Sequence, residues 1–95
     1  MEITKKVVFI AKDDCVQELK DLLITMVAAS RAEAGCSLYN IYQLTEKPTE
    51  FTVLETWENA DFLKAHGQSD HYNHYKANFE QYTADKYKDD MTILA

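Results

Sequence analysis

The side chains that could do chemistry follow one another in the second half of the chain. Trp57 is followed by His66, His71, Tyr72 and Tyr75. A histidine suits the role of general base because its unperturbed pKa of about 6.5 lies close to physiological pH. Aromatic rings suit the walls of a pocket for a flat ligand. We therefore interpret His66, His71 and Trp57 as the candidate catalytic group.

Four further side chains are candidates for binding a substrate. Glu55 and Trp57 are two residues apart in a predicted strand, so they point to the same face. Tyr72 is a candidate aromatic wall, and Tyr42 or Tyr75 a candidate hydrogen-bond donor. The candidate binding residues are thus Tyr42, Glu55, Tyr72 and Tyr75.

Each of these residues also has an ordinary structural interpretation. Trp57 at the end of a strand is a large hydrophobe that a small core would bury. His66 stands before Gly67 and could simply end a short helix, where a positive charge suits the dipole. Tyr72 and Tyr75 belong to a helical stripe that is typical of a core. Glu55 could be an exposed cross-strand partner.

Metal and thiol chemistry have weaker support in the sequence. His71 and His74 are three residues apart, which places them on one helix face, but no HExxH or CxxC motif accompanies them. We therefore expect no metal and no cofactor. Cys15 and Cys36 are too few for a disulfide framework. Cys15 lies at a predicted helix start, where the dipole could lower its pKa and leave a reactive thiol.

Composition limits the possible partners and the size of the protein. The 95 residues carry a formal net charge of −6, which disfavours nucleic acid and anionic membrane surfaces. No run approaches the length of a membrane span, and the N-terminus has no signal-peptide pattern. We expect one domain, residues 1–95, in the cytoplasm.

The elements that must position these residues can be predicted from periodicity and capping. Asp14 and Gln17 fit a capping box that starts an amphipathic helix. Asn59 should cap a second helix, and Ser69 or Asp70 a third. Strands are predicted over residues 3–11, 36–44, 51–58 and 86–94. The order β-α-β-β-α-β indicates an α+β, ferredoxin-like fold with a four-stranded antiparallel sheet. Its apolar open face predicts a homodimer.

Several short motifs occur together in a fixed order. They are Arg31-Ala-Glu-Ala-Gly-Cys36, Glu55-Thr-Trp-Glu58, Ala65-His66 and Ser69-Asp-His-Tyr72. In this order and spacing, nearly the whole chain resembles the antibiotic biosynthesis monooxygenase (ABM) family. The resemblance implies a dimeric α+β barrel with a pocket between sheet and helices. It also implies one of three activities: cofactor-independent oxygenation of quinols or anthrones, haem degradation, or isomerisation of a phospho-sugar.

The motif residues match the family unevenly. Trp57, His66, His71 and Tyr72 match its tryptophan, two histidines and aromatic residue, whereas Val53 stands where the polyketide oxygenases have asparagine. The haem degraders' histidine falls near Lys76. The resemblance therefore implies a cofactor-independent monooxygenase that oxidises a small aromatic quinol or phenol with O2. The alternatives are a non-redox isomerase of the same fold and a non-catalytic dimer that binds an aromatic or haem-like ligand.

Overall fold

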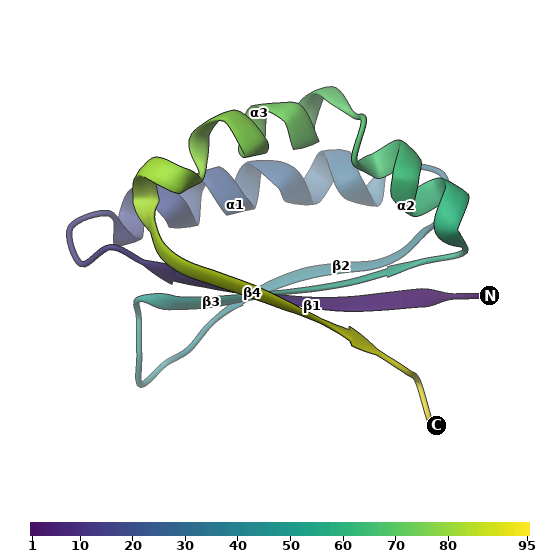
Figure 1. Ribbon diagram of the computed structural model, residues 1–95, viewed down its shortest axis with the longest axis horizontal. Helices are drawn as coiled ribbons and strands as arrows, with labels where there is room; N and C mark the ends of the chain where they lie inside the picture. Colours follow the sequence, from purple (N-terminus) through teal and green to yellow (C-terminus); the bar gives the residue numbers. More distant parts are fainter.

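The chain folds into a four-stranded antiparallel sheet with all its helices on one face, as Figure 1 shows for the computed structural model of residues 1–95. This is the predicted ferredoxin-like α+β arrangement, with the second helix of the pattern split in two. In chain order the elements are β1 (Ile3–Ala11), α1 (Val16–Arg31), β2 (Cys36–Gln43), β3 (Glu50–Trp57), α2 (Ala60–His66), α3 (Asp70–Asn78), a 3-10 turn (Glu80–Tyr82) and β4 (Thr83–Met91).

The strand register decides which residues face the helices. The strand order is β2-β3-β1-β4, so β2 and β4 are the edges. Val7 of β1 pairs with Val53 of β3 and Lys88 of β4, and these rows alternate between the two faces. The helix-covered face therefore carries the core residues Val7, Phe9, Phe51 and Val53, all of which are buried. Tyr87 and Met91 fall on the open face.

Helix α1 supplies the second half of the core. Leu19, Leu22, Leu23 and Met26 recur at three- and four-residue steps and are all buried. The capping box predicted from Asp14 and Gln17 at its start is wrong. The helix begins at Val16 with Cys15 at the N-cap, and no side chain caps it.

The capping residues Asp14 and Gln17 instead make other contacts. The Asp14 carboxylate lies 3.4 Å from the Cys15 sulfur, and the Gln17 amide donates to Asp21 one turn along the helix. The helix therefore begins one residue later than the capping box requires, and the Gln17 side chain pairs with Asp21 along the helix instead of reaching back to Asp14.

The short helices start where the sequence predicts. The Asn59 side chain accepts from the amides of Asp61 and Phe62, and the Ser69 hydroxyl accepts from the amide of Tyr72. Ser69 is thus the cap of the third helix, for which the sequence offered Ser69 or Asp70.

The last strand begins at Thr83, three residues before the predicted start. No helix of the chain is long and apolar enough to cross a membrane.

Gly35 joins α1 to β2 and also determines where α2 lies. Its φ is +80°, a value that L side chains rarely adopt. A Cβ built on Gly35 would overlap the ring of Phe62, which is a residue of α2. The missing side chain therefore lets α2 pack directly on the chain that follows Glu33.

Arg31, at the end of α1, lies along the exposed edge strand β2. Its Nε donates to the backbone carbonyl of Tyr39 at 3.0 Å, and its Nη2 donates to the Asn40 side chain at 3.0 Å. Arg31 thus places a cation in the last turn of α1, where it suits the helix dipole, and also binds the strand next to the helix.

Candidate active site

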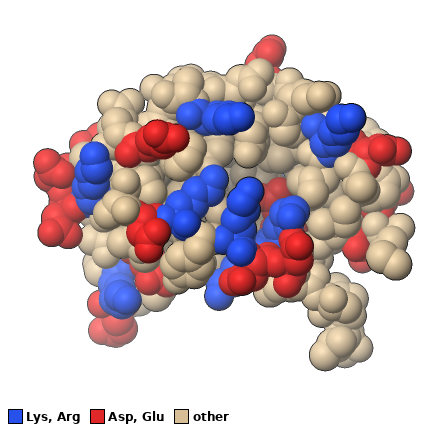
Figure 2. Space-filling view, viewed as in Figure 1, with Lys and Arg blue, Asp and Glu red and all other residues tan.

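A cavity of about 260 Å3 lies between the helices and the sheet. The space-filling view shows a hollow on this side, with Lys and Arg side chains gathered where β4 passes beneath the helices (Figure 2). Most of the wall is apolar or aromatic, and the polar groups are few. The lining includes Val7, Phe9, Met26, Tyr39, Val53, Glu55, His66, Tyr72, Tyr75, Lys5, Lys86 and Lys88. Such a pocket is typical of a small-molecule site.

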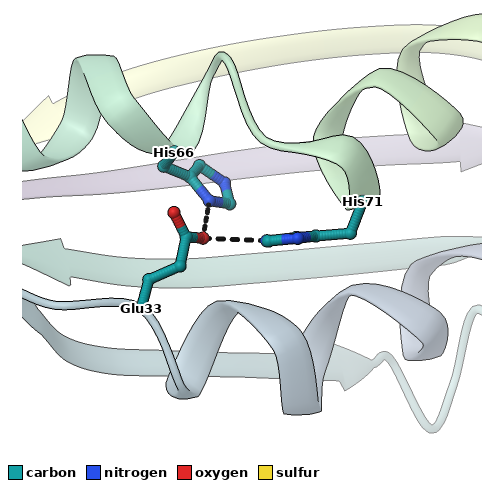
Figure 3. Close-up of side chains that lie close together, drawn as sticks. All are labelled: Glu33, His66 and His71. Carbon is teal, nitrogen blue, oxygen red and sulfur yellow. Dashed lines mark hydrogen bonds and ion pairs between the residues drawn. The ribbon is translucent and has the colours of Figure 1, made fainter.

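Three side chains from separate parts of the chain meet beside this cavity. His66 ends α2, His71 lies in the first turn of α3, and Glu33 lies between α1 and β2 (Figure 3). One carboxylate oxygen, Oε2 of Glu33, is 2.6 Å from His66 Nδ1 and 2.8 Å from His71 Nε2. An ionised carboxylate can only accept, so both ring nitrogens carry the hydrogen.

This hydrogen bond fixes the chemistry of the other nitrogen of His66. With the hydrogen on Nδ1, Nε2 of a neutral imidazole carries a lone pair. Nε2 has no hydrogen-bond partner in the chain, and His66 is the histidine that lines the cavity. The side chain is only 3% exposed. Its ring packs on Trp57 at a centroid distance of 4.6 Å, which holds its orientation. The arrangement can therefore accept a proton from a ligand in the cavity.

Trp57 and Glu55 form a second polar pair under the cavity. The indole Nε1 donates to Glu55 Oε1 at 2.8 Å, and both side chains are buried. Trp57 itself is fully buried and does not reach the cavity surface, whereas Glu55 does. The tryptophan thus orients a carboxylate whose second oxygen is free to accept from a ligand.

Three tyrosines line the same space as neutral donors. Burial, and next the negative charge of Glu55, raises the pKa of Tyr39 above its ordinary value. Burial and the neighbouring Tyr72 likewise raise the pKa of Tyr75, and burial and Glu55 raise that of Tyr72. The hydroxyls of Tyr72 and Tyr75 bond to no group of the chain. They remain protonated at physiological pH and can donate to a ligand oxygen.

The structure places all but one of the predicted site residues in two groups. His66, Glu55, Tyr72 and Tyr75 line the cavity. Trp57 and His71 lie behind it and act on Glu55 and on Glu33.

Tyr42 belongs to neither group, because it lies on the open face of the sheet and is 52% exposed. The β2–β3 register pairs Tyr42 with Thr52, and Tyr39 with Glu55, so Tyr39 takes the place on the cavity wall.

Sequence reasoning assigned no role to Glu33 and overlooked the lysines of the cavity. Glu33 falls in the turn after α1, and no periodicity relates it to histidines more than thirty residues away. The sequence does indicate the position of two of these lysines. Lys86 and Lys88 alternate with Tyr87 and Asp89 in the last strand, so they share the face opposite Tyr87.

Two expectations about metals and thiols can be compared with the geometry. His71 meets Glu33 and His66, whose ligand atoms lie within 4.8 Å of one another, and His74 takes no part. Two histidines and a carboxylate are a donor set that divalent metals use, although here hydrogen bonds already join all three. The reactive-thiol prediction for Cys15 is not supported, because desolvation and the adjacent Asp14 raise the pKa of its thiol.

The chain combines a ferredoxin-like sheet, a cavity beneath split helices and a carboxylate–histidine pair at that cavity. These features define a class of small α+β domains that bind a ligand or act as enzymes. The comparisons with known proteins then specify the family. Residues 3–78 match the family model described as antibiotic biosynthesis monooxygenase. The chain belongs to this family, as the resemblance in its motifs implied.

Individual relatives agree with this assignment. The chain is 32% identical over 69 residues to the Mycobacterium tuberculosis protein named "Putative monooxygenase Rv0793", a match that covers 73% of this chain and 67% of the relative. The solved structure of Rv0793 superposes with a TM-score of 0.93 at 24% identity, covering 100% of this chain and 97% of that one. PA3566 from Pseudomonas aeruginosa superposes with a TM-score of 0.95 at 26% identity, covering 99% and 95%.

Proposed function

We propose that the protein is a cofactor-independent monooxygenase that oxidises a small aromatic quinol or phenol with O2. The observation that carries the proposal is the free Nε2 of His66 at the cavity, with Nδ1 held by Glu33. A base oriented by a carboxylate on its other nitrogen is a recurring arrangement for proton abstraction. Membership of the ABM family supports the same class of reaction.

The reaction needs a deprotonated substrate and no external reductant. His66 Nε2 takes the hydroxyl proton, and the resulting phenolate passes one electron to O2. The two radicals combine to form a carbon–oxygen bond, and the imidazolium of His66 returns its proton to the resulting peroxide anion. The peroxide then loses water, with the second hydrogen coming from the same carbon, and a carbonyl remains in the product. One oxygen atom enters the product and the other leaves as water, so the substrate supplies all the electrons.

The other groups of the cavity support the charges that arise in these steps. Glu33 stabilises the imidazolium that forms on His66. The hydroxyls of Tyr72 and Tyr75 can donate to the phenolate or to reduced oxygen. Glu55 can accept from a second hydroxyl of a quinol. The apolar remainder of the wall keeps water out and strengthens each of these contacts.

Oxygen uptake tests the proposal. The EDTA-treated, flavin-free protein is supplied with hydroquinones, dihydroxynaphthalenes and anthrones. We expect uptake that falls at least about 100-fold in His66→Gln. His74→Ala is the matched control, because His74 is an exposed histidine on α3 outside the cavity.

Two other results would point to the alternatives. Substrate conversion without oxygen uptake would favour an isomerase. Binding without conversion of any compound would favour a non-catalytic binding domain. Activity restored only by an added metal ion would contradict the cofactor-independent mechanism and point to Glu33, His66 and His71 as ligands.

We also propose that two copies pair through the open face of the sheet. Tyr42, Thr52, Val8 and Tyr87 form one row across that face. Tyr42 and Tyr87 are 52% and 48% exposed, and Met91 lies nearby on the same face. A sheet face with large exposed side chains is typical of a surface that a partner covers. Sedimentation that finds only monomer at micromolar concentration would contradict the dimer.

A further inference from the structure

We propose that the ligand of this cavity carries an anionic substituent, a carboxylate or a phosphate, which Lys86 and Lys88 of β4 bind. This inference rests on the proposed function, because it names the substrate class of the same site as an aromatic acid with a phenolic or quinol hydroxyl. Three observations support it: the placement of the lysines, their lack of ion-pair partners and their separation from Glu55 along the sheet.

Positive charge is concentrated at this cavity in a protein that is otherwise acidic. The chain has ten basic and sixteen acidic side chains, yet three lysines and one acidic residue, Glu55, line the cavity. Lys5 is already neutralised, because its ammonium lies 2.6 Å from the Asp90 carboxylate. Lys86 and Lys88 make no ion pair with any residue. Their charges are therefore available to a ligand.

The side chain of Lys86 lies against aromatic rings, an environment that is unusual for a lysine. It is partly buried, and its ammonium lies 4.6 Å from the ring centroid of Phe79 and 5.4 Å from those of Phe9 and Tyr75. Burial, and next the positive charge of Lys88, lowers the pKa of Lys86 below its ordinary value. An anion bound between the two ammonium groups would offset both the desolvation and the mutual repulsion.

The aromatic contacts alone do not account for both lysines. Cation–π packing could explain why Lys86 lies on Phe79. Lys88 has no such ring, and its neighbour in the register is Val7 of β1. Two successive helix-facing positions of β4 thus carry unpaired lysines beside an apolar wall. A single anionic group near both explains the pair.

The strand register gives the distance between the end of the ligand at Glu55 and its anionic end at Lys86 and Lys88. Lys5 pairs with Glu55, Val7 with Lys88 and Phe9 with Lys86, so these rows succeed one another along the sheet. At about 3.3 Å per residue, Lys88 lies about 7 Å and Lys86 about 13 Å along the strands from the Glu55 row. The cavity of 260 Å3 is smaller than the pockets of about 300–1,000 Å3 that hold drug-sized ligands. A one- or two-ring aromatic acid fits both limits.

Anaerobic calorimetry tests the inference without depending on turnover. The probes are 1,4-dihydroxynaphthalene, the same quinol with a 2-carboxylate, and 1-naphthyl phosphate beside 1-naphthoate and neutral 1-naphthol. The proteins are the natural chain, the double variant Lys86→Met with Lys88→Met, and Lys64→Met. Lys64 is an exposed lysine on α2 that does not line the cavity, so this variant shows the effect of losing a positive charge elsewhere on the surface.

We expect the natural protein and Lys64→Met to bind an anionic probe at least about tenfold more tightly than its neutral counterpart, as charge-assisted hydrogen bonds predict. The double variant should reduce this preference to about twofold or less while retaining its fold by circular dichroism. The stronger of the carboxylate and phosphate probes identifies the natural group. Equal binding of neutral and anionic probes, no binding of either, or a preference that survives in the double variant would overturn the inference.

If the oxygenase proposal fails but this inference holds, the result is different. The natural protein then still prefers the anionic probe, and oxygen uptake is absent.

Discussion

At the scale of single residues, the chemistry of the site depends on which nitrogen of His66 carries the hydrogen. Glu33 determines this, because its Oε2 is within hydrogen-bond distance of Nδ1. The same oxygen holds His71, which fixes the carboxylate from the other side. In the proposed mechanism His71 is therefore a positioning residue that acts through Glu33, whereas the sequence offered both His66 and His71 as candidate catalytic residues.

Glu33→Gln should slow the oxidation about 100-fold in kcat with little change in KM. The amide that replaces the carboxylate cannot stabilise a positive imidazolium, although it can still accept one hydrogen bond. Steady-state oxygen uptake measures the effect, and Glu58→Gln, at an exposed carboxylate outside the cavity, is the matched control. A variant that changes KM alone would contradict the role of Glu33.

Trp57→Phe should lower the free energy of unfolding by about 2–4 kcal/mol. The indole is fully buried, and its loss leaves a void and removes the hydrogen bond to Glu55. Urea denaturation followed by circular dichroism measures the loss. Tyr82→Phe is the control, because the Tyr82 hydroxyl bonds to no group of the chain and the residue does not line the cavity, and we expect a change within about 0.5 kcal/mol there.

The buried tyrosines predict a stability that falls at high pH. Tyr39 and Tyr75 have pKa values raised above the ordinary value of 10.0 by burial. In the unfolded chain they ionise near pH 10, whereas in the folded protein they stay protonated, so the unfolded state binds fewer protons. Stability should therefore be fully present below pH 10 and fall progressively above it. Urea titrations across this range test the sign, and a stability that rises above pH 10 would contradict it.

At the scale of elements, the site depends on the contact between the α1–β2 turn and α2. Gly35 has a positive φ, and the ring of Phe62 occupies the space of a Cβ there. His66 is four residues beyond Phe62 on the same short helix, so this contact helps to bring its imidazole to Glu33.

Gly35→Ala should cost at least about 2 kcal/mol of stability, because it adds both backbone strain and a clash. It should also reduce activity by moving α2. Gly67→Ala is the matched control for stability: its Cβ would meet nothing closer than 3.5 Å, and no positive φ is required. There we expect a change within about 1 kcal/mol. Thermal unfolding of both variants makes the comparison, and equal losses would contradict the argument.

The sequence predicted the elements well where one periodic pattern determines them. Alternation placed Glu55 with Val53 and Trp57, and side-chain caps marked Asn59 and Ser69 correctly. It failed where a pairing between distant segments decides the outcome. The face of Tyr42 depends on its register with β3, and the role of Glu33 depends on how α2 packs beside the α1–β2 turn. Neither is encoded in local spacing.

At the scale of the whole molecule, the two faces of the sheet have different surroundings. One face is covered by helices (Figure 1) and borders the cavity, and the other carries the exposed side chains of Tyr42, Tyr87 and Met91. β4 contributes to both, because its lysines face the cavity and Tyr87 faces outward.

Tyr87→Asp should shift the proposed dimer to monomer. A charge introduced in the middle of an apolar contact loses its hydration when the faces meet. Analytical ultracentrifugation over a concentration series measures the dissociation constant, which we expect to rise at least about tenfold. Asp61→Asn, at an exposed position on α2, should leave it unchanged. A dimer that tolerates Tyr87→Asp would contradict pairing through this face.

The contact between Arg31 and β2 has a consequence for the behaviour of the protein in concentrated solution. The other edge strand, β4, carries five Lys and Asp residues between Asp85 and Asp90, whereas β2 has no charged residue over its eight positions. Neutral, β-prone edges are templates for strand addition and aggregation. The Arg31 guanidinium occupies the Tyr39 carbonyl and places a positive charge beside this strand. One arginine from a neighbouring helix therefore occupies a backbone acceptor of this edge and adds a charge to it, two features that disfavour the addition of a strand from another chain.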